Sequence, residues 1–459
     1  MNPPVAHPLP GATAVSLSRG LLFVFALPGI LQAFMLAPAG SILQGVYAKE
    51  SGIALTLLGT AIIAVRACDF ISDLLIGYLS DRSVEHGISR KRWIAAGTVL
   101  SAIALWFLFR PPQQVSVWYY GVWFLIANIG WSLVEIPYRS WSIEFSPEPN
   151  VRTRIVSWIA VASLVGGLLF YLVAPAGHAL GLLDSNGYDM KMLGLTAVIV
   201  APLLPLLSFY TLWRVPDGQA ARPAPVAVHR EDFALLWKSV IGNVPLLRLL
   251  ACLTVFNFMT GMSQGVSLLY LTNYLLLPSS VNAVFAVAIP ISMLGIPMWG
   301  FLVRKFDRQR VWAVGLILGG ITYACIGLLP PKPSVALLTA LLCLSAFFVL
   351  STLVAAPVIM GDIIDYGREK FGVERAGVYL SFEAQILKGI AAVAAGAGML
   401  ILGWAGFDAT KSGADLTPQA IAAIRWVAGG APAFGFIGTG ALLWLLPISH
   451  AAAKPAKAD

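Results

Sequence analysis

Twelve long apolar stretches constrain the fold of this chain more than any other feature of its sequence. Each has about the 20 residues that an α-helix needs to cross the hydrocarbon core of a bilayer. We therefore expect an all-α membrane protein with twelve transmembrane helices. The predicted spans cover roughly residues 20–46, 53–79, 93–110, 117–145, 153–175, 192–213, 246–275, 280–303, 311–329, 334–360, 378–404 and 419–447.

The composition excludes an ordinary soluble protein. Of the 459 residues, 58% are hydrophobic and 11% are charged, whereas soluble domains carry about 25% charged residues. A soluble chain of this length would need far more polar surface. The net charge of +8 does not indicate a nucleic-acid partner, because the positive charge lies in short loops between apolar runs. The lipid bilayer is the expected surrounding.

The loop charges predict the orientation of the chain in the membrane. Of the 30 Lys and Arg residues, 21 fall in loops on one side, 5 fall on the other side and 4 lie within spans. Cytoplasmic loops carry the excess of Lys and Arg. We therefore expect a multi-pass protein of the plasma (inner) membrane with both termini in the cytoplasm.

A long non-apolar stretch divides the spans into two sets of six. The halves echo each other, since "IGYLSDR…SRKRW" ends the second span and "WGFLVRKFDRQRVW" ends the eighth. Two six-span halves repeated in parallel describe the major facilitator fold, here expected as a monomer. The predicted parts are an N-terminal bundle (1–213), a cytoplasmic linker (214–245), a C-terminal bundle (246–447) and a cytoplasmic tail (448–459).

Three charges lie on one face of the second span. Arg66, Asp69 and Asp73 are spaced three and four residues apart, and Asp69 lies about 15 Å from the inner end of the helix. An ionisable group at that depth costs at least about 2.5–3.5 kcal/mol. One interpretation is a structural Arg66–Asp69 ion pair with Asp73 near a water-filled vestibule. The preferred one is a cation site, or a shared-proton pair, at Asp69 and Asp73 with the Ser72 hydroxyl.

Another buried charge predicts a contact between the halves. Lys388 lies about ten residues into the eleventh span and needs a partner at that depth. Asp69 or Asp73 would serve, so Lys388 and Arg66 are the expected charge partners of the cation site.

Polar residues in the fourth and seventh spans are candidates for the substrate cavity. Glu135 and Arg139 form an i,i+4 pair that is either self-neutralised or turned toward the cavity of the second span. The two polar residues of the seventh span either line the cavity or join helices. The full set is Asn128, Trp131, Glu135, Arg139, Asn257 and Gln264.

Charges in the inner loops are expected to gate the cytoplasmic side. They would form and break salt bridges as that side closes and opens. These residues are Asp81, Arg82, Arg90, Arg92, Asp362, Asp365, Arg368 and Arg375.

Three stretches together resemble one transporter family. "RACDFISDLLIGYLSDR", "VEIPYRSWSIEFSPEPNVRTR" and "MGDIIDYGREKFGVERAG…KG" are similar to the glycoside–pentoside–hexuronide:cation symporters, the family of the melibiose permease. The resemblance covers nearly the whole chain. It implies that Asp69 and Asp73 bind the coupling ion, and that Arg66, Glu135 and Lys388 match positions that the family uses.

The sequence departs from that family at the positions that hold sugar hydroxyls. By rough alignment, the acid of the first span and the arginine of the fifth fall at Ala33 and Ala160. Ser72 replaces an Asn, which leaves both sodium and protons open as the coupling ion. The family also includes an animal symporter for lysophosphatidylcholine, so the fold does not imply a sugar.

We therefore expect a secondary active transporter that couples Na⁺ or H⁺ to a small-molecule solute, a sugar or glycoside, by alternating access. The first alternative is a lysolipid or another amphiphile as cargo. A further alternative is a non-transporting receptor or assembly factor. The sequence shows no nucleophile–base pair and no metal-ligand spacing, so we expect neither an enzyme nor a cofactor besides the coupling ion.

Overall fold

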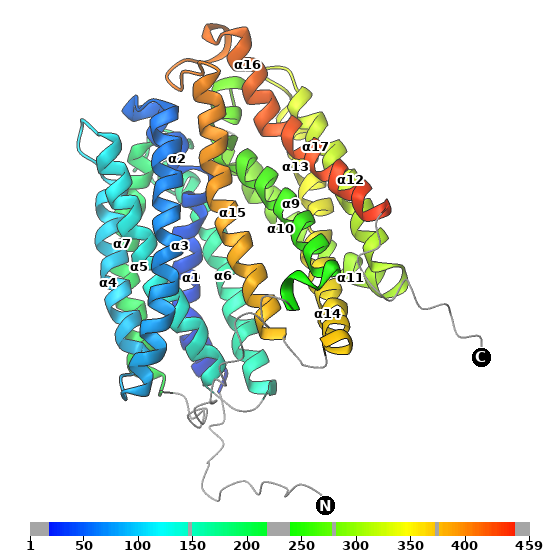
Figure 1. Ribbon diagram of the computed structural model, residues 1–459. Coiled ribbons are helices and arrows are strands. Elements are labelled where there is room, and N and C mark those ends of the chain that lie inside the picture. Colours follow the sequence, from blue (N-terminus) through cyan, green and yellow to red (C-terminus); the bar gives the residue numbers. More distant parts are fainter. Residues whose placement is uncertain (1–17, 146–148, 218–238, 278–280, 372–375, 446–459) are drawn as a thin grey trace, which may run out of the picture.

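The computed structural model describes residues 18–145, 149–217, 239–277, 281–371 and 376–445, and helices are the only regular secondary structure in these ranges. The chain forms two bundles that stand side by side, the first blue to green and the second green to red (Figure 1). The first half contains α1 (Arg19–Ser41), α2 (Leu43–Ser51), α3 (Leu55–Glu85), α4 (Arg90–Phe109), α5 (Val117–Glu144), α6 (Pro149–Ala179) and α7 (Met190–Arg214).

The second half repeats this arrangement with more interruptions. It contains α9 (Val244–Leu269), η1 (Tyr270–Tyr274), α10 (Val281–Met293), α11 (Gly295–Lys305), α12 (Arg308–Leu328), α13 (Val335–Val349), α14 (Ser351–Phe371), α15 (Ala376–Trp404), α16 (Pro418–Arg425), η3 (Trp426–Gly430) and α17 (Ala431–Leu445).

Eleven helices in the described ranges are long and apolar enough to cross a membrane. The predicted eighth span is the twelfth crossing, and it is broken at Leu294 into α10 and α11. Pro297 explains the break, because proline has no N–H to donate to the carbonyl one turn earlier. Five residues beyond the break, the indole Nε1 of Trp299 in α11 donates to the main-chain oxygen of Phe347 at 2.8 Å, whereas Leu294 at the break itself is exposed.

Polar caps explain why several helices begin where they do. The first N–H groups of a helix have no partner within it, and a side-chain oxygen just before the helix satisfies one of them. Capping side chains accept such bonds at the start of seven helices. They are Ser18, Ser89, Ser116, Asp189, Asn243, Asp307 and Thr417.

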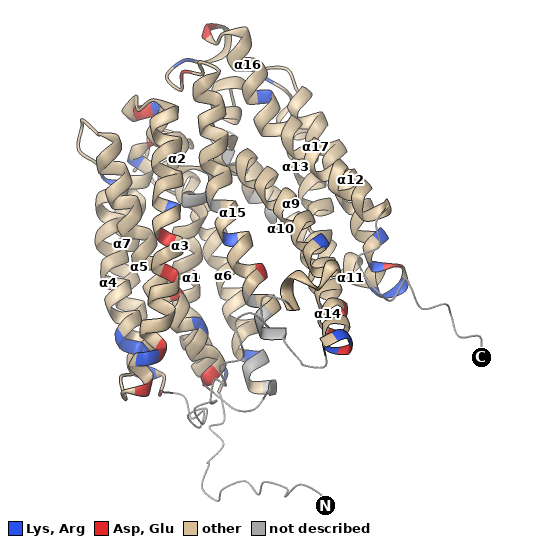
Figure 2. Ribbon diagram, viewed as in Figure 1, with Lys and Arg blue, Asp and Glu red and all other residues tan. Residues whose placement is uncertain are grey.

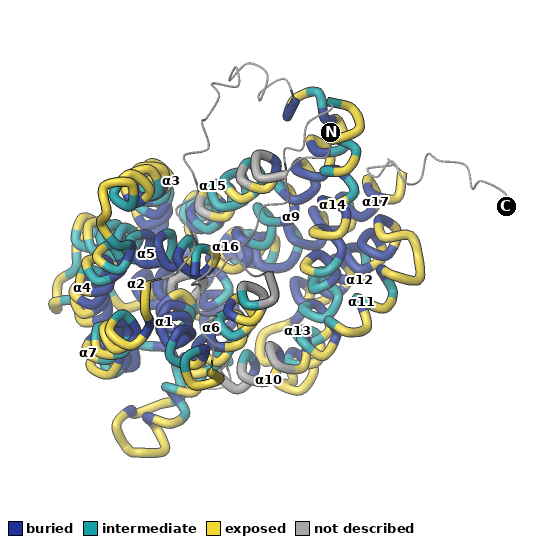
Figure 3. Tube along the Cα trace, turned by 90° about the horizontal axis from the view of Figure 1, so that it is seen from below, coloured by how far each residue is buried: buried dark blue, intermediate teal, exposed yellow. Residues whose placement is uncertain are grey.

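The apolar core is continuous at one end of the bundle and divided at the other. At the upper end of Figure 1, one cluster of buried side chains joins both halves and includes Tyr47 of α2 and Leu268 of α9. Toward the lower end, the first half has a separate cluster around Trp141, and the second half has another around Trp312. Figure 3, seen from the lower end, shows buried residues gathered within each half. Among the described residues, the apolar core therefore joins the halves at the upper end and is divided between them at the lower end.

Glycines make the upper closure tight. A Cβ atom on Gly59 of α3 would lie 2.7 Å from the main-chain oxygen of Gly396 of α15. Nearer the upper end, a Cβ on Gly403 would lie 2.6 Å from the side chain of Thr56. These contacts leave no room for a methyl group between the two helices.

Charges gather at the lower end of each half (Figure 2). Arg90, whose side chain is 8% exposed, lies 2.6 Å from Glu144 and 2.8 Å from Asp81. All three residues belong to the first half. The Arg90 cluster, defined as Arg90 with Asp81 and Glu144, thus ties α3, α4 and α5 together at their lower ends.

The other predicted gating residues also pair within one half. In the second half, Arg308 lies 2.5 Å from Asp362, and Arg368 lies 3.1 Å from Asp365. Arg82 donates a 3.2 Å hydrogen bond to the Tyr78 hydroxyl of its own helix. Arg92 is exposed. Arg375 lies outside the described residues.

Replacing Arg90 by alanine is expected to destabilise the first half. Hydrogen bonds to charged groups contribute about 1.5–3 kcal/mol each, and the two acids would lose a buried partner. We expect the Arg90→Ala variant to melt at a clearly lower temperature in detergent. Arg82→Ala, at an exposed position on α3, is the control and should melt like the wild type. Equal melting temperatures for both variants would show that the Arg90 cluster does not hold the half together.

Candidate functional site

The candidate cation site lies where α3, α5 and α15 meet, midway between the two ends. The side chains of Asp69 and Asp73 are 5% and 4% exposed, respectively. Because the two acids are four residues apart, the helix turns both toward the same side. In Figure 2 the acidic bands near the middle of α3 lie at about the height of a basic band on α15.

Asp73 joins the two halves. Its Oδ2 atom forms an ion pair with the ammonium of Lys388, which belongs to the second half. The other oxygen of the carboxylate, Oδ1, is buried and has no hydrogen-bond partner among the described residues. A buried acceptor without a donor is uncommon and calls for an explanation. Asp73 thus keeps one oxygen available to a further donor or to a cation.

Asp69 is held within the first half. The Arg66 guanidinium lies 3.6 Å from its Oδ2 atom, and the Ser132 hydroxyl donates to its Oδ1 atom at 3.4 Å. Arg66 is itself fixed from α5, since its Nη1 donates to the amide oxygen of Asn128 at 2.9 Å. The same guanidinium lies 5.5 Å from the ring centroid of Phe124. The spacing of charged residues in the sequence does not predict the hydrogen bond from Ser132 to Asp69.

Ser72 lies beside the two acids and is half-buried. Its hydroxyl donates to the main-chain carbonyl of Asp69 at 2.9 Å, so its proton is used within α3. The lone pairs of the Ser72 hydroxyl oxygen remain free, so Ser72 would bind a cation through this oxygen.

A second polar group lies on α5. The Trp131 indole donates to the Oε2 of Glu135 at 2.6 Å, and Arg139 lies 2.7 Å from the Oε1 of the same carboxylate. The Arg139 side chain is 77% exposed, whereas that of Glu135 is 19% exposed. These three side chains present the Arg139 guanidinium to the surroundings, with the half-buried Glu135 carboxylate behind it.

The structure does not bring the two candidates of α9 into these polar groups. Asn257 donates to the main-chain oxygen of Leu253 at 2.8 Å, within its own helix. Gln264 is exposed. Neither has a hydrogen bond to the charged groups of α3 or α5 among the described residues.

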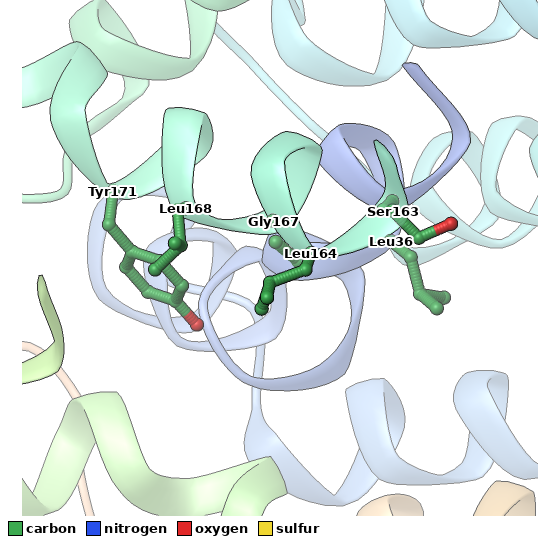
Figure 4. Close-up of a pocket in the computed structure, with 8 residues that line it drawn as sticks. Leu36, Ser163, Leu164, Gly167, Leu168 and Tyr171 are labelled. Atoms are coloured by element: carbon green, nitrogen blue, oxygen red, sulfur yellow. The ribbon is translucent and has the colours of Figure 1, made fainter. Parts of the chain in front are cut away.

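A pocket between α1 and α6 was not predicted. It has a volume of about 250 Å³ and lies on the surface that α6 turns toward the second half, where the Tyr171 ring lies 5.6 Å from that of Phe285 of α10. Figure 4 shows the labelled side chains around it. Its lining residues are Ala33, Leu36, Ala37, Ser163, Leu164, Gly167, Leu168 and Tyr171.

The sequence analysis identified two alanines at positions where the resembled symporters have charged residues, and one of these alanines lines the pocket. Ala33 lines it, whereas Ala160 is exposed and does not. The contribution of α6 carried no signal in the sequence, because its apolar residues are those of any membrane-spanning helix.

Comparison with known proteins gives a family match over almost the whole chain. The model of the family described as "MFS/sugar transport protein" matches residues 24–450. The chain is 24% identical over 383 residues to the inner membrane symporter YicJ of Escherichia coli, covering 80% of this chain and 78% of YicJ. It is 25% identical over 372 residues to the putative glycoside/cation symporter YagG of the same organism, covering 78% and 76%.

Solved structures share the fold at low sequence identity. A bacterial homologue of the human lysosomal transporter Spinster, in an inward-facing and unoccupied conformation, aligns with a TM-score of 0.64 at 15% identity and covers 93% of this chain and 95% of its own. A D-xylose–proton symporter aligns with a TM-score of 0.60 at 18% identity, covering 92% and 96%.

Proposed function

The chain belongs to the MFS/sugar transport protein family, and from this premise we propose that it is a cation-coupled glycoside symporter. Secondary transport across a membrane is the activity of this family. The choice of a glycoside and a cation is our inference, and the buried pair of acids at Asp69 and Asp73 carries it.

The pair of acids favours a small cation as the coupling partner. Both carboxylates are buried at mid-depth, and the Oδ1 atom of Asp73 has no donor among the described residues. Carboxylate and hydroxyl oxygens are the ligands of hard cations such as Na⁺, and a shared proton would satisfy the same two acids. We therefore propose Na⁺ or H⁺ as the ion, with Asp69 and Asp73 as its ligands.

The ion pair between the halves suggests how coupling works. Lys388 neutralises Asp73 while no cation is bound. A cation at Asp73 would compete with the Lys388 ammonium and loosen this contact between the halves. The opening and closing of the two ends would then depend on whether the ion is present, which is the requirement for alternating access.

The state of the structure fits one step of such a cycle. The apolar core is closed at the upper end and divided at the lower end, where most Lys and Arg residues gather. The excess of positive charge marks the cytoplasmic side of a membrane protein. We propose that the lower end faces the cytoplasm, that both termini lie there, and that this is the inward-open state.

The polar group on α5 is our candidate for the sugar. Trp131, Glu135 and Arg139 offer an indole ring, a carboxylate and five N–H donors, which are groups that bind hydroxyls. Similarity to YagG, whose name describes a glycoside/cation symporter, supports a glycoside as the cargo.

A lysolipid or another amphiphile is the second candidate cargo. The apolar lining of the α1/α6 pocket, with Ala33 among its residues, favours it.

A thermal-stability screen of the purified protein tests the proposal. It crosses sodium, lithium and pH steps with glycosides, pentosides, hexuronides and lysolipids. A ligand that binds the native state at 100 times its Kd raises the stability by about 2.7 kcal/mol. We expect a glycoside to raise the melting temperature only when the coupling ion is present. If lysolipids raised the melting temperature and no glycoside did, the choice of a glycoside as cargo would be overturned.

A further inference from the structure

We propose that the α1/α6 pocket binds an apolar aglycone of about the size of an aromatic ring. The preferred cargo would then be a glycoside that carries such a group, rather than a free sugar. This inference rests on the proposed function, because it names the class of substrate for the same transport site.

The chemistry of the lining selects an apolar ligand. Six of the eight lining side chains are those of Ala, Leu or Gly, and the only hydroxyls are those of Ser163 and Tyr171. Two hydroxyls cannot replace the water that surrounds a sugar ring, so a sugar in this pocket would lose hydrogen bonds. An aromatic ring makes no such hydrogen bonds with water, and it would stack on the ring of Tyr171.

The size of the pocket fits a substituted ring. An apolar cavity of about 150 Å³ in another protein binds benzene. The α1/α6 pocket has about 250 Å³ and is open to its surroundings rather than enclosed, so the rest of a larger ligand would lie outside it.

The pocket lies level with one end of the polar group on α5. The Tyr138 hydroxyl of α5 donates to the main-chain oxygen of Phe25 of α1 at 2.5 Å, which fixes the two antiparallel helices in register. Ala33 lies eight residues, or about 12 Å, further along α1. It is therefore level with Gly130 and Trp131 of α5. Glu135 and Arg139 lie about 6 Å and 12 Å beyond Trp131, nearer the lower end. A ligand with its apolar part in the pocket would therefore extend toward the lower end to reach Arg139.

The backbone, rather than a movable side chain, creates the space. Gly166 brings α6 against α1 so closely that a Cβ atom there would lie 1.9 Å from the main-chain oxygen of Ile30. At the next residue, Gly167, a Cβ atom would meet nothing within 4 Å. A larger side chain at Gly167 would thus fill the pocket without disturbing the packing of the two helices.

Gly167→Leu is therefore the variant that tests the pocket. The matched control is Gly438→Leu, because Gly438 is also a half-buried helical glycine whose Cβ atom would meet nothing within 4 Å, on α17. The wild type and both variants are purified and reconstituted in lipid nanodiscs. Methyl and phenyl forms of β-D-glucosides, β-D-xylosides and β-D-glucuronides are titrated with sodium and at low pH, and Kd is measured by tryptophan fluorescence.

We expect phenyl glycosides to bind about 10-fold to 100-fold more tightly than the methyl glycosides of the same sugar in the wild type. The control should keep this ratio, and Gly167→Leu should bring it close to one. A ratio close to one in the wild type, or a ratio that survives Gly167→Leu, would overturn the inference while leaving glycoside symport in place.

The remaining outcomes concern the cargo itself. Absence of binding by every glycoside, with either cation, would overturn the proposed function together with this inference. Binding of a lysolipid that Gly167→Leu abolishes would also overturn the inference, because it would assign the pocket to an acyl chain.

Discussion

Replacing Asp73 by asparagine is expected to abolish cation-driven uptake. The amide has no charge to balance a bound cation, and the Lys388 ammonium loses its ion-pair partner. Removing one member of a fully buried pair costs about 3–5 kcal/mol, and here the cost should lie near the lower value, because Asp73 is buried but the Lys388 side chain is 37% exposed. A cost of about 3 kcal/mol corresponds to a change of about 100-fold in an equilibrium. In proteoliposomes with an imposed sodium or proton gradient, the variant should accumulate no more glycoside than empty vesicles.

Two further variants separate coupling from folding. Glu85→Gln makes the same kind of change at an exposed position on α3 and should transport like the wild type. The double variant Asp73→Asn/Lys388→Met removes both charges, so it should recover the melting temperature that the single variant loses but not the uptake. Normal gradient-driven uptake by Asp73→Asn would show that this acid does not couple the ion.

Adding one methyl group to Gly396 is expected to prevent the closure of the upper end. A Cβ atom there would lie 2.5 Å from the side chain of Ile63 and 2.7 Å from the main-chain oxygen of Gly59. Overpacking of this kind costs about 1–3 kcal/mol, and only the state that is closed at the upper end would bear the cost. The equilibrium should therefore shift by about 10-fold to 100-fold toward opening, and transport should fall to a similar extent.

Gly389→Ala provides the control on the same helix. A Cβ atom at Gly389 would meet nothing within 4 Å, whereas both substitutions improve helix propensity equally. Spin labels at Leu182 and Ser412, in loops at the upper end, would report the distance between the halves by pulsed electron paramagnetic resonance. Gly396→Ala should lengthen this distance and Gly389→Ala should not. Equal distances in both variants would mean that the glycine contacts do not control closure.

The fold could be predicted from the sequence because length and apolarity decide which segments cross a bilayer. The family match and the fold of the solved structures confirm the family and the all-helical membrane fold. The break at Leu294 was not predicted. Its signal, Pro297 after Gly295, was present, but an uninterrupted apolar run was interpreted as one helix.

The sequence predicted contacts in the site only for charged residues, because a charge inside the membrane needs an oppositely charged partner. Lys388 required an acid at its depth, and spacing alone left Asp69 and Asp73 as equal choices. The structure pairs Lys388 with Asp73, because Arg66 is turned toward Asp69 by Asn128. Apolar residues carry no such requirement, so the pocket had no signal in the sequence beyond Ala33, which the family comparison had singled out on α1. The sequence also could not predict at which end the two halves are in contact, because the same sequence adopts both the inward-open and the outward-open state.

The pair formed by Asp73 and Lys388 links positions that are 315 residues apart in the chain. Among related sequences, loss of one charge should therefore accompany loss of the other, since a lone ionised group at that depth is costly. Charges at the lower end of each half would vary independently of those in the opposite half, because the Arg90 cluster and the Arg308–Asp362 pair are each confined to one half. A chimaera that joins halves from two relatives should thus tolerate mismatched loops but not a mismatched pair at positions 73 and 388.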